Sequence, residues 1–325
     1  MKKKVNFSEI YGKIKVLILY CFSVPTLLSF LIVSPENAFS DLAYVTNQGS
    51  DSVSVINIGT NTVTGTIAVG SNPQGIAVTP NGMFAYVVNF GGNNVSVVDT
   101  GVQIVTATVT VGIGPQGVAI TPPNGLFAYV VNISDNNVSV IDTRANTVVA
   151  TVAVGNQPFR IAMTPNGSFA YVPNSGSGNV SVISVGTKTV VATVTVGSSL
   201  GGVAITPNGS FAYVGGSNNV VVIDTGTNTV TATITVGNIN FGIAFTPNGL
   251  FSYVTNFSNR NVSVINTGSK TVMPRRSAFG GTSDGNEIQM SLGGGRGGNL
   301  GRRWGFGRKH GARLPRVCLA FRITG

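Results

Sequence analysis

Side chains that can carry acid–base, nucleophilic or metal chemistry are scarce in this chain. The single histidine is His310, and the two cysteines are Cys21 and Cys318. Residues 41–273 therefore contain no histidine and no cysteine, which excludes Ser-His and Cys-His nucleophiles, histidine-ligated metal sites and disulfides from that region. We expect no enzymatic activity, no metal site and no cofactor.

The remaining candidates for acid–base chemistry are carboxylates, and three of them recur at one position of a repeat. Asp99, Asp142 and Asp224 each end a valine-rich segment, where other copies carry Asn or Ser. Such side chains accept hydrogen bonds from backbone N–H groups in turns. We interpret these aspartates as turn formers, and we assign a hairpin role to Asp51 because it aligns with Asn93.

A repeat of about 40 residues must position all of these side chains. Each copy opens on a tyrosine, and successive tyrosines are 42, 43, 42, 42 and 40 residues apart. A fixed period in this range indicates a repeat architecture. The tyrosines are Tyr44, Tyr86, Tyr129, Tyr171, Tyr213 and Tyr253.

Each copy predicts four short strands rich in β-branched residues. Examples are Ala43–Asn47, Val53–Ile56, Thr189–Val196 and Gly75–Thr79, and T-P-N-G turn signals recur after strands of the last kind. Four-stranded units of about 40 residues indicate an all-β fold of the β-propeller type. A parallel β-helix is the alternative, but its repeat is shorter, at about 20 to 30 residues.

These repeats resemble the YVTN family of β-propellers. Residues 44–47 and 253–256 both read Tyr-Val-Thr-Asn, and the V-S-V-I-D-T, T-V-V-A-T and T-P-N-G elements of the family recur across residues 41–273. The resemblance implies a propeller, usually of seven blades, in exported and surface-layer proteins. The family also resembles lactonase-type and cytochrome-nitrite-reductase propellers, so membership does not determine function.

Residues 1–40 have the pattern of a secretory signal peptide. Five lysines precede an uncharged run from Val16 to Val33, and Ala38 and Ser40 supply small residues before a cleavage site. We expect an extracytoplasmic protein (secreted, periplasmic or at the cell surface) with no membrane attachment after cleavage. An uncleaved anchor is the alternative, because the run approaches the length that spans a bilayer.

The net charge of +10 comes from the two ends of the chain. The repeats at 41–273 hold five basic and six acidic residues, a net charge of −1, whereas residues 274–325 hold nine arginines, one lysine and two acidic residues. A nearly neutral repeat surface does not attract a polyanion, so we expect no nucleic-acid partner for the repeats.

The repeat pattern stops abruptly at Pro274. Residues 274–325 contain thirteen glycines and predict a Gly/Arg-rich disordered tail, because such a composition buries too little apolar surface to fold. A shifted reading frame or a fusion is our hypothesis for the change. Gly293–Gly298 resembles an RGG-type RNA-binding segment, for which out-of-frame translation is an equal explanation.

The array predicts about six blades, of which four are complete. The fourth strand of each copy should become the inner strand of the next blade, which leaves blade one without an inner strand, and blade six loses its outermost strand after Met273. We therefore expect a ring that does not close properly. The exposed blade edges would invite self-association.

Departures from the repeat suggest a ligand site on the face where the hairpins and the loops before the inner strands meet. Pro-Gln-Gly at 73–75 and 115–117 becomes Pro158-Phe159-Arg160, and later Asn240-Phe241-Gly242. Aromatic residues and arginine are over-represented at binding hot spots. The candidate ligand-binding residues are Phe90, Phe159, Arg160, Phe241, Phe257 and Arg260.

These observations favour an exported, non-catalytic β-propeller that acts as a binding or surface scaffold module. Its expected partner is a protein or a glycan at the cell surface. The alternatives are a lactonase-like or redox-associated propeller enzyme and a frame-shifted product without function.

Overall fold

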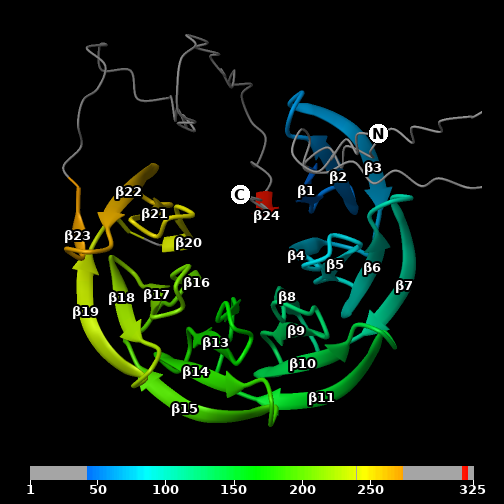
Figure 1. The fold of residues 1–325 in the computed structure, drawn as a ribbon. Helices are drawn as coiled ribbons and strands as arrows, with labels where there is room; N and C mark the ends of the chain where they lie inside the picture. The colour runs from blue at the N-terminus through cyan, green and yellow to red at the C-terminus, as the bar shows by residue number, and fades with distance from the viewer. Residues whose placement is uncertain (1–41, 239, 274–316, 321–325) are drawn as a thin grey trace, which may run out of the picture.

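The structure, a computed structural model, describes residues 42–238, 240–273 and 317–320. The described residues contain no helix and form six four-stranded antiparallel sheets. Figure 1 shows these sheets as successive blades of an open arc. The predicted all-β class, the six blades and the unclosed ring are confirmed. The predicted signal peptide at 1–40 and the RGG-like run lie outside the described residues.

Blades one to three take their strands as follows, from the inner to the outer strand. Blade one contains β24 (Val317–Ala320), β1 (Leu42–Asn47), β2 (Ser52–Asn57) and β3 (Thr62–Ala68). Blade two contains β4 (Pro73–Val78), β5 (Phe84–Asn89), β6 (Asn94–Asp99) and β7 (Ile104–Thr110). Blade three contains β8 (Pro115–Ile120), β9 (Phe127–Asn132), β10 (Asn137–Asp142) and β11 (Thr147–Ala153).

Blades four to six repeat this order. Blade four contains β12 (Ala162–Met163), β13 (Phe169–Asn174), β14 (Asn179–Ser184) and β15 (Thr189–Thr195). Blade five contains β16 (Val203–Ile205), β17 (Phe211–Gly215), β18 (Asn219–Asp224) and β19 (Thr229–Thr235). Blade six contains β20 (Asn240–Phe245), β21 (Phe251–Asn256), β22 (Asn261–Asn266) and β23 (Thr271–Val272).

Blade one differs from the prediction because it has an inner strand. β24 pairs antiparallel with β1, so that Val317 lies opposite Asn47 and Ala320 opposite Tyr44. These four residues belong to the segment predicted to be disordered. The physical reason is that Val-Cys-Leu-Ala is an apolar run, and the inner edge of β1 would otherwise present unpaired backbone groups. The rest of 274–325 lies outside the described residues.

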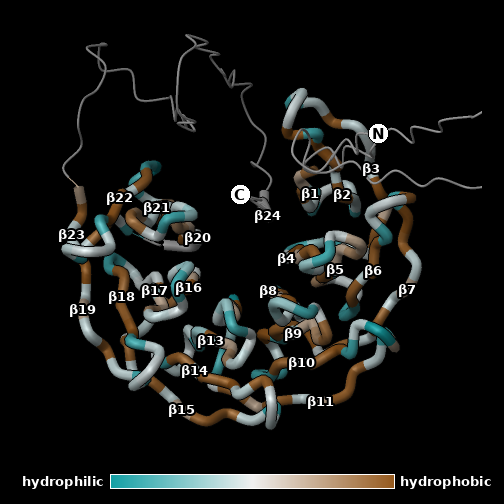
Figure 2. The backbone as a smooth tube through the Cα atoms, viewed as in Figure 1, coloured by the Kyte–Doolittle hydropathy of each residue, from teal (hydrophilic) through white to brown (hydrophobic). Residues whose placement is uncertain are grey.

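The core lies between blades, because the two middle strands of each blade have two apolar faces. Figure 2 shows hydrophobic residues along the strands and hydrophilic residues at many of the turns. We call the face that packs on the next blade the leading face, and the face that packs on the preceding blade the trailing face. The leading face of blade three packs on the trailing face of blade four. The first is formed by Tyr129, Val131, Val138, Val140 and Val152, and the second by Ile161, Ala170, Val172 and Ile183.

Two of the leading-face tyrosines also reach an asparagine in the next blade. The Tyr86 hydroxyl donates to Asn146 Oδ1 at 2.8 Å, and the Tyr171 hydroxyl donates to Asn228 Oδ1 at 2.8 Å. Both asparagines have positive φ at the end of the turn before the outer strand. Residues at this turn position share positive φ and are Asn61, Gln103, Asn146, Lys188, Asn228 and Lys270.

Lysine at the same turn position makes a different contact. The Lys188 ammonium lies 4.5 Å from the centre of the Phe127 ring, and the Lys270 ammonium lies 4.6 Å from that of Phe211. The Tyr129 hydroxyl then has only a 3.5 Å contact to a backbone carbonyl, and the Tyr213 hydroxyl has no partner among the described residues. The blade interfaces are therefore alike in packing but unequal in hydrogen bonding.

We predict that Asn228→Ala destabilises the protein by about 1 to 2 kcal/mol more than Asn61→Ala, because it leaves the buried Tyr171 hydroxyl without its amide acceptor. Asn61 is a matched control, since both asparagines have φ of 55° and no tyrosine bond to Asn61 is present within the described residues. Urea denaturation followed by far-UV circular dichroism measures the difference. Equal destabilisation of the two variants would contradict the prediction.

Alkaline pH should destabilise the protein. Burial raises the pKa of Tyr86, Tyr129 and Tyr171 to about 12, with nearby Asp142 and Asp224 charges adding to the effect at Tyr86 and Tyr171 respectively. The fold favours the neutral phenols, so their contribution is fully present below pH 10, the unfolded pKa, and is lost as the pH rises towards 12. A pKa difference of about two units between the unfolded and folded states corresponds to about 3 kcal/mol of folding stability for each tyrosine.

The measurement is the free energy of unfolding in urea at several pH values between 9 and 12. Tyr129→Phe is the control variant, because it removes one titrating hydroxyl whose hydrogen bond to Val185 O is long, at 3.5 Å. We expect its stability to fall less steeply with pH than that of the wild type. A wild-type free energy of unfolding that is constant through this pH interval would show that burial does not raise the pKa of these tyrosines.

Candidate functional site

One face of the arc is built from hairpins and from the loops that lead into the inner strands. The hairpins between the two middle strands, such as 90–93 and 133–136, bond to these loops through the backbone. Phe90 N donates to Asn72 O at 3.0 Å, and Ser134 N donates to Ile113 O at 3.2 Å. We call this surface the hairpin face.

Side chains of one blade's hairpin also hold the loop that enters the next blade. Asp51 Oδ1 accepts from Asn72 N at 2.7 Å, and Asn136 Oδ1 accepts from Gln157 N at 2.8 Å. The hairpin role predicted for Asp51 is confirmed. These bonds make the hairpin face a continuous surface in which hairpins and loops from neighbouring blades are fixed relative to one another.

The recurring aspartates act in turns, as predicted. Asp142 Oδ1 accepts from Arg144 N at 2.8 Å and from Ala145 N at 3.0 Å, and these two backbone bonds lower the pKa of the Asp142 carboxyl. Asp224 does the same for Gly226 and Thr227, and its pKa is likewise lowered, chiefly by the Thr227 backbone bond. Within the part of the chain that the structure describes, no group of three His, Cys, Asp or Glu side chains could hold a metal ion.

The predicted ligand-binding residues lie on three blades. Phe90 belongs to the hairpin of blade two, and a Cβ on Gly114 of the next blade would lie 3.4 Å from its ring. Phe257 and Arg260 belong to the hairpin of blade six, where 67% of Phe257 is exposed and Arg260 has a φ of 53°. Phe241 lies in β20, and its side chain is outside what the structure describes.

Phe159 and Arg160 come together at the entry to blade four. The Arg160 guanidinium carbon lies 4.8 Å from the centre of the Phe159 ring, and both side chains are half-buried. In blade three the same position is Gly117, whose added Cβ would lie 3.2 Å from both Arg160 Cα and Phe159 O. Glycine thus lets neighbouring inner strands approach closely. Where arginine replaces it, regular pairing of the inner strand begins only at Ala162.

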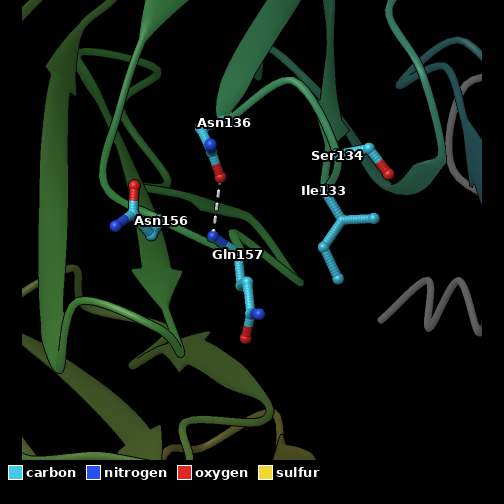
Figure 3. Close-up of a pocket in the computed structure, with 5 residues that line it drawn as sticks. All are labelled: Ile133, Ser134, Asn136, Asn156 and Gln157. Carbon is cyan, nitrogen blue, oxygen red and sulfur yellow. Dashed lines mark hydrogen bonds between the residues drawn. The ribbon is translucent and has the colours of Figure 1, made fainter.

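A depression of about 550 Å³ lies on the hairpin face immediately before Phe159. Figure 3 shows the residues that line it, which come from the hairpin of blade three and the loop into blade four. Ser177 Oγ accepts from Asn156 N at 2.7 Å, so both loop residues are held through their backbone. The lining residues are Ile133, Ser134, Asn136, Asn156 and Gln157.

Sequence reasoning missed this depression. Its lining residues belong to ordinary turn types, and no single one of them departs from what a hairpin or loop requires. The signal that could have found it is the concentration of side-chain amides at 136, 156 and 157, next to the Phe159-Arg160 departure.

The opposite face of the arc is a weaker candidate for a ligand site. A second depression of about 370 Å³ lies among the T-P-N-G turns of blades four and five. Its polar atoms are engaged within the turns: Thr164 Oγ1 donates to Asn166 Oδ1 at 2.7 Å, and Thr225 Oγ1 donates to Gly209 O at 2.6 Å. These bonds explain why the turn sequence recurs, and they favour the hairpin face as the place for a ligand.

Comparisons with known proteins agree with the fold. No protein-family model matches the chain. A chain of hydrazine synthase from Kuenenia stuttgartiensis is similar in structure, with a TM-score of 0.64 and 27% sequence identity over 70% of this chain and 73% of that chain. A functionally unknown protein from Desulfotomaculum acetoxidans is similar with a TM-score of 0.65 and 20% identity over 73% of this chain and 79% of that chain.

A sequence match covers a small part of the chain. Over 37 residues, or 11% of this chain, it is 65% identical to a PE-PGRS family protein of Mycobacterium tuberculosis, of which the match spans only 8%. Together with the six four-stranded sheets, the structural similarities support a β-propeller-like repeat fold. Membership of the YVTN family, and of its surface-layer type, stays a prediction.

We predict that Gly75→Ala destabilises the protein by about 1 to 3 kcal/mol, because the added Cβ would lie 2.6 Å from the backbone oxygen of Gln116 in the next inner strand. Gly49→Ala is the control, since a Cβ there would have nothing within 4 Å. Denaturant unfolding of both variants is the measurement. If Gly75→Ala were as stable as Gly49→Ala, glycine would not be required by the approach of the inner strands.

Proposed function

We propose that this protein is an exported, non-catalytic binding or surface scaffold module that contacts a partner through its hairpin face. The observation that carries this proposal is the depression of about 550 Å³ beside the Phe159-Arg160 pair. Its lining offers amide and hydroxyl groups, and the aromatic ring and guanidinium of Phe159 and Arg160 follow directly after it in the chain, which together is a chemistry suited to recognition.

A glycan is the partner class that this lining favours, and a surface protein is the other. Asn136, Asn156 and Gln157 place three side-chain amides around one depression, and amides can both donate to and accept from sugar hydroxyls. None of the five residues that line it is charged, which is consistent with a ligand that is not strongly anionic.

The extracytoplasmic location is part of the proposal and rests on the signal-peptide pattern of residues 1–40. Cell fractionation followed by N-terminal sequencing of the mature chain tests both the location and the cleavage after Ser40.

A propeller enzyme is the second candidate, and the similarity to a hydrazine synthase chain is the observation that favours it. The repeats contain no histidine and no cysteine, so a reactive centre within 41–273 would have to use other side chains. Bound haem or metal in the purified protein, or hydrolysis of a lactone, would support this candidate over the binding module.

We expect the purified full chain to bind at least one member of an immobilised glycan panel, and we expect the double variant Asn156→Ala/Gln157→Ala to bind it at least tenfold more weakly. Arg160→Gly, which restores the residue of blades two and three, should also weaken binding. Val191→Thr is the control, because Val191 is 52% exposed on an outer strand.

Glycan binding that is equal in all variants would place the site elsewhere. Absence of glycan binding, together with capture of a defined surface protein that depends on the same residues, would identify the partner as a protein. Absence of both would refute the proposal.

A further inference from the structure

Among the described residues, no blade packs on the leading face of blade six. Tyr253 is 46% exposed, whereas the equivalent tyrosines of the five other blades are 0 to 4% exposed. Thr255 is exposed where Val88 is buried, and Val262 and Val264 are half-buried. Because tyrosine and valine at these positions are covered in every other blade, the exposure is explained by the lack of a neighbouring blade within the described part of the chain and not by a polar strand.

The outer edge of this blade is also incomplete. β23 has two residues and pairs with Ile265 and Asn266, whereas the outer strands of blades one to five have seven residues. Met273 N donates to Val264 O at 2.8 Å, but Asn261 to Ser263 have no outer-strand partner among the described residues. Blade six therefore presents an apolar face beside an unpaired strand edge, which is the combination that another sheet can extend.

The interfaces between the blades of this chain specify what would cover that face. Leading faces built from tyrosine and valine pack on trailing faces built from alanine, valine and isoleucine. The interface between blades five and six is the nearest example, with Tyr213, Val220 and Val222 packed against Val254 and Ile265. The matching occupant is thus the trailing face of another blade.

Blade one of the same chain, or of a second copy, is not a suitable donor of that trailing face. Its residues Ala43 and Val45 are already buried, at 4% and 7% exposure. A second copy that docked through blade one would first have to uncover them.

We propose that the leading face of blade six, formed by Tyr253, Thr255, Val262 and Val264, is a docking surface for a blade of the same repeat carried by a different polypeptide. The occupant is a four-stranded Val/Thr-rich sheet whose trailing face carries the Ala-x-Val and Ile pattern. This surface is separate from the hairpin face, so the inference does not depend on the proposed function.

The test uses the full chain and, as the probe, a fluorescently labelled polypeptide of residues 111–153, which carries the sequence of blade three and, without neighbouring blades, is expected to fold only on docking. We expect saturable one-to-one binding by fluorescence anisotropy, with slower hydrogen exchange at residues 251–264 of the full chain. Tyr253→Lys in the full chain should weaken binding at least tenfold, and Val264→Thr, which keeps the side-chain shape, should weaken it about threefold or more.

Two controls separate docking from non-specific adhesion. Val149→Lys in the full chain places a lysine at a site that is 50% exposed, similar to Tyr253, and should leave probe binding unchanged. A probe that carries Ile141→Lys in its trailing face should not bind. Circular dichroism checks that both lysine variants of the full chain are folded.

Three outcomes would overturn the proposal. The first is that the wild-type chain does not bind the probe. The second is that Tyr253→Lys and Val149→Lys bind it equally. The third is that the wild-type chain alone sediments as a dimer that Tyr253→Lys dissociates, which would make a second copy the occupant.

Discussion

The packing of one blade's leading face on the next blade's trailing face is the interaction on which the rest of the structure depends. A four-stranded sheet with two apolar faces cannot be stable in water by itself, so each blade requires neighbours. The repeat supplies them: every tyrosine of blades one to five is buried against the following blade, and the alanine, valine and isoleucine that meet it recur at fixed positions. The turns and the hairpin face are consequences of holding these two faces in register.

Much of this arrangement could be predicted from the sequence, because the same pattern of residue types occurs in six copies. The strand pattern of β1, β2 and β4 and the turn role of Asp142 and Asp224 follow from residue types that recur at a constant spacing. The short inner strand β12 could not be predicted, because it depends on the distance between neighbouring inner strands. Only the structure shows that a Cβ added to Gly117 would lie 3.2 Å from the Cα of Arg160.

The candidate site was predictable in part. Departure from the repeat identified Phe159 and Arg160, and the structure brings them into contact. It did not identify Asn136, Asn156 and Gln157, because asparagine and glutamine are expected in hairpins and loops whatever their function. The depression arises from how two blades meet, and a reading along one chain does not contain that information. The pairing of β24 with β1 was missed for a similar reason, since the apolar run at 317–320 interrupts a segment whose average composition indicates disorder.

The pairing of β24 with β1 has a consequence for synthesis of the chain. In the other five blades only a short turn separates the inner strand from the strand with which it pairs. Val317, in contrast, is made 270 residues after Asn47. At about 5 to 20 residues per second, roughly 14 to 54 seconds separate the two strands on the ribosome. β24 is therefore not yet made to pair with β1 while the other five blades are translated. Among the described strands, β24 is synthesised after the strands of blades two to six but completes the sheet of blade one, so blade one is finished after blades whose strands are made later than β1 to β3.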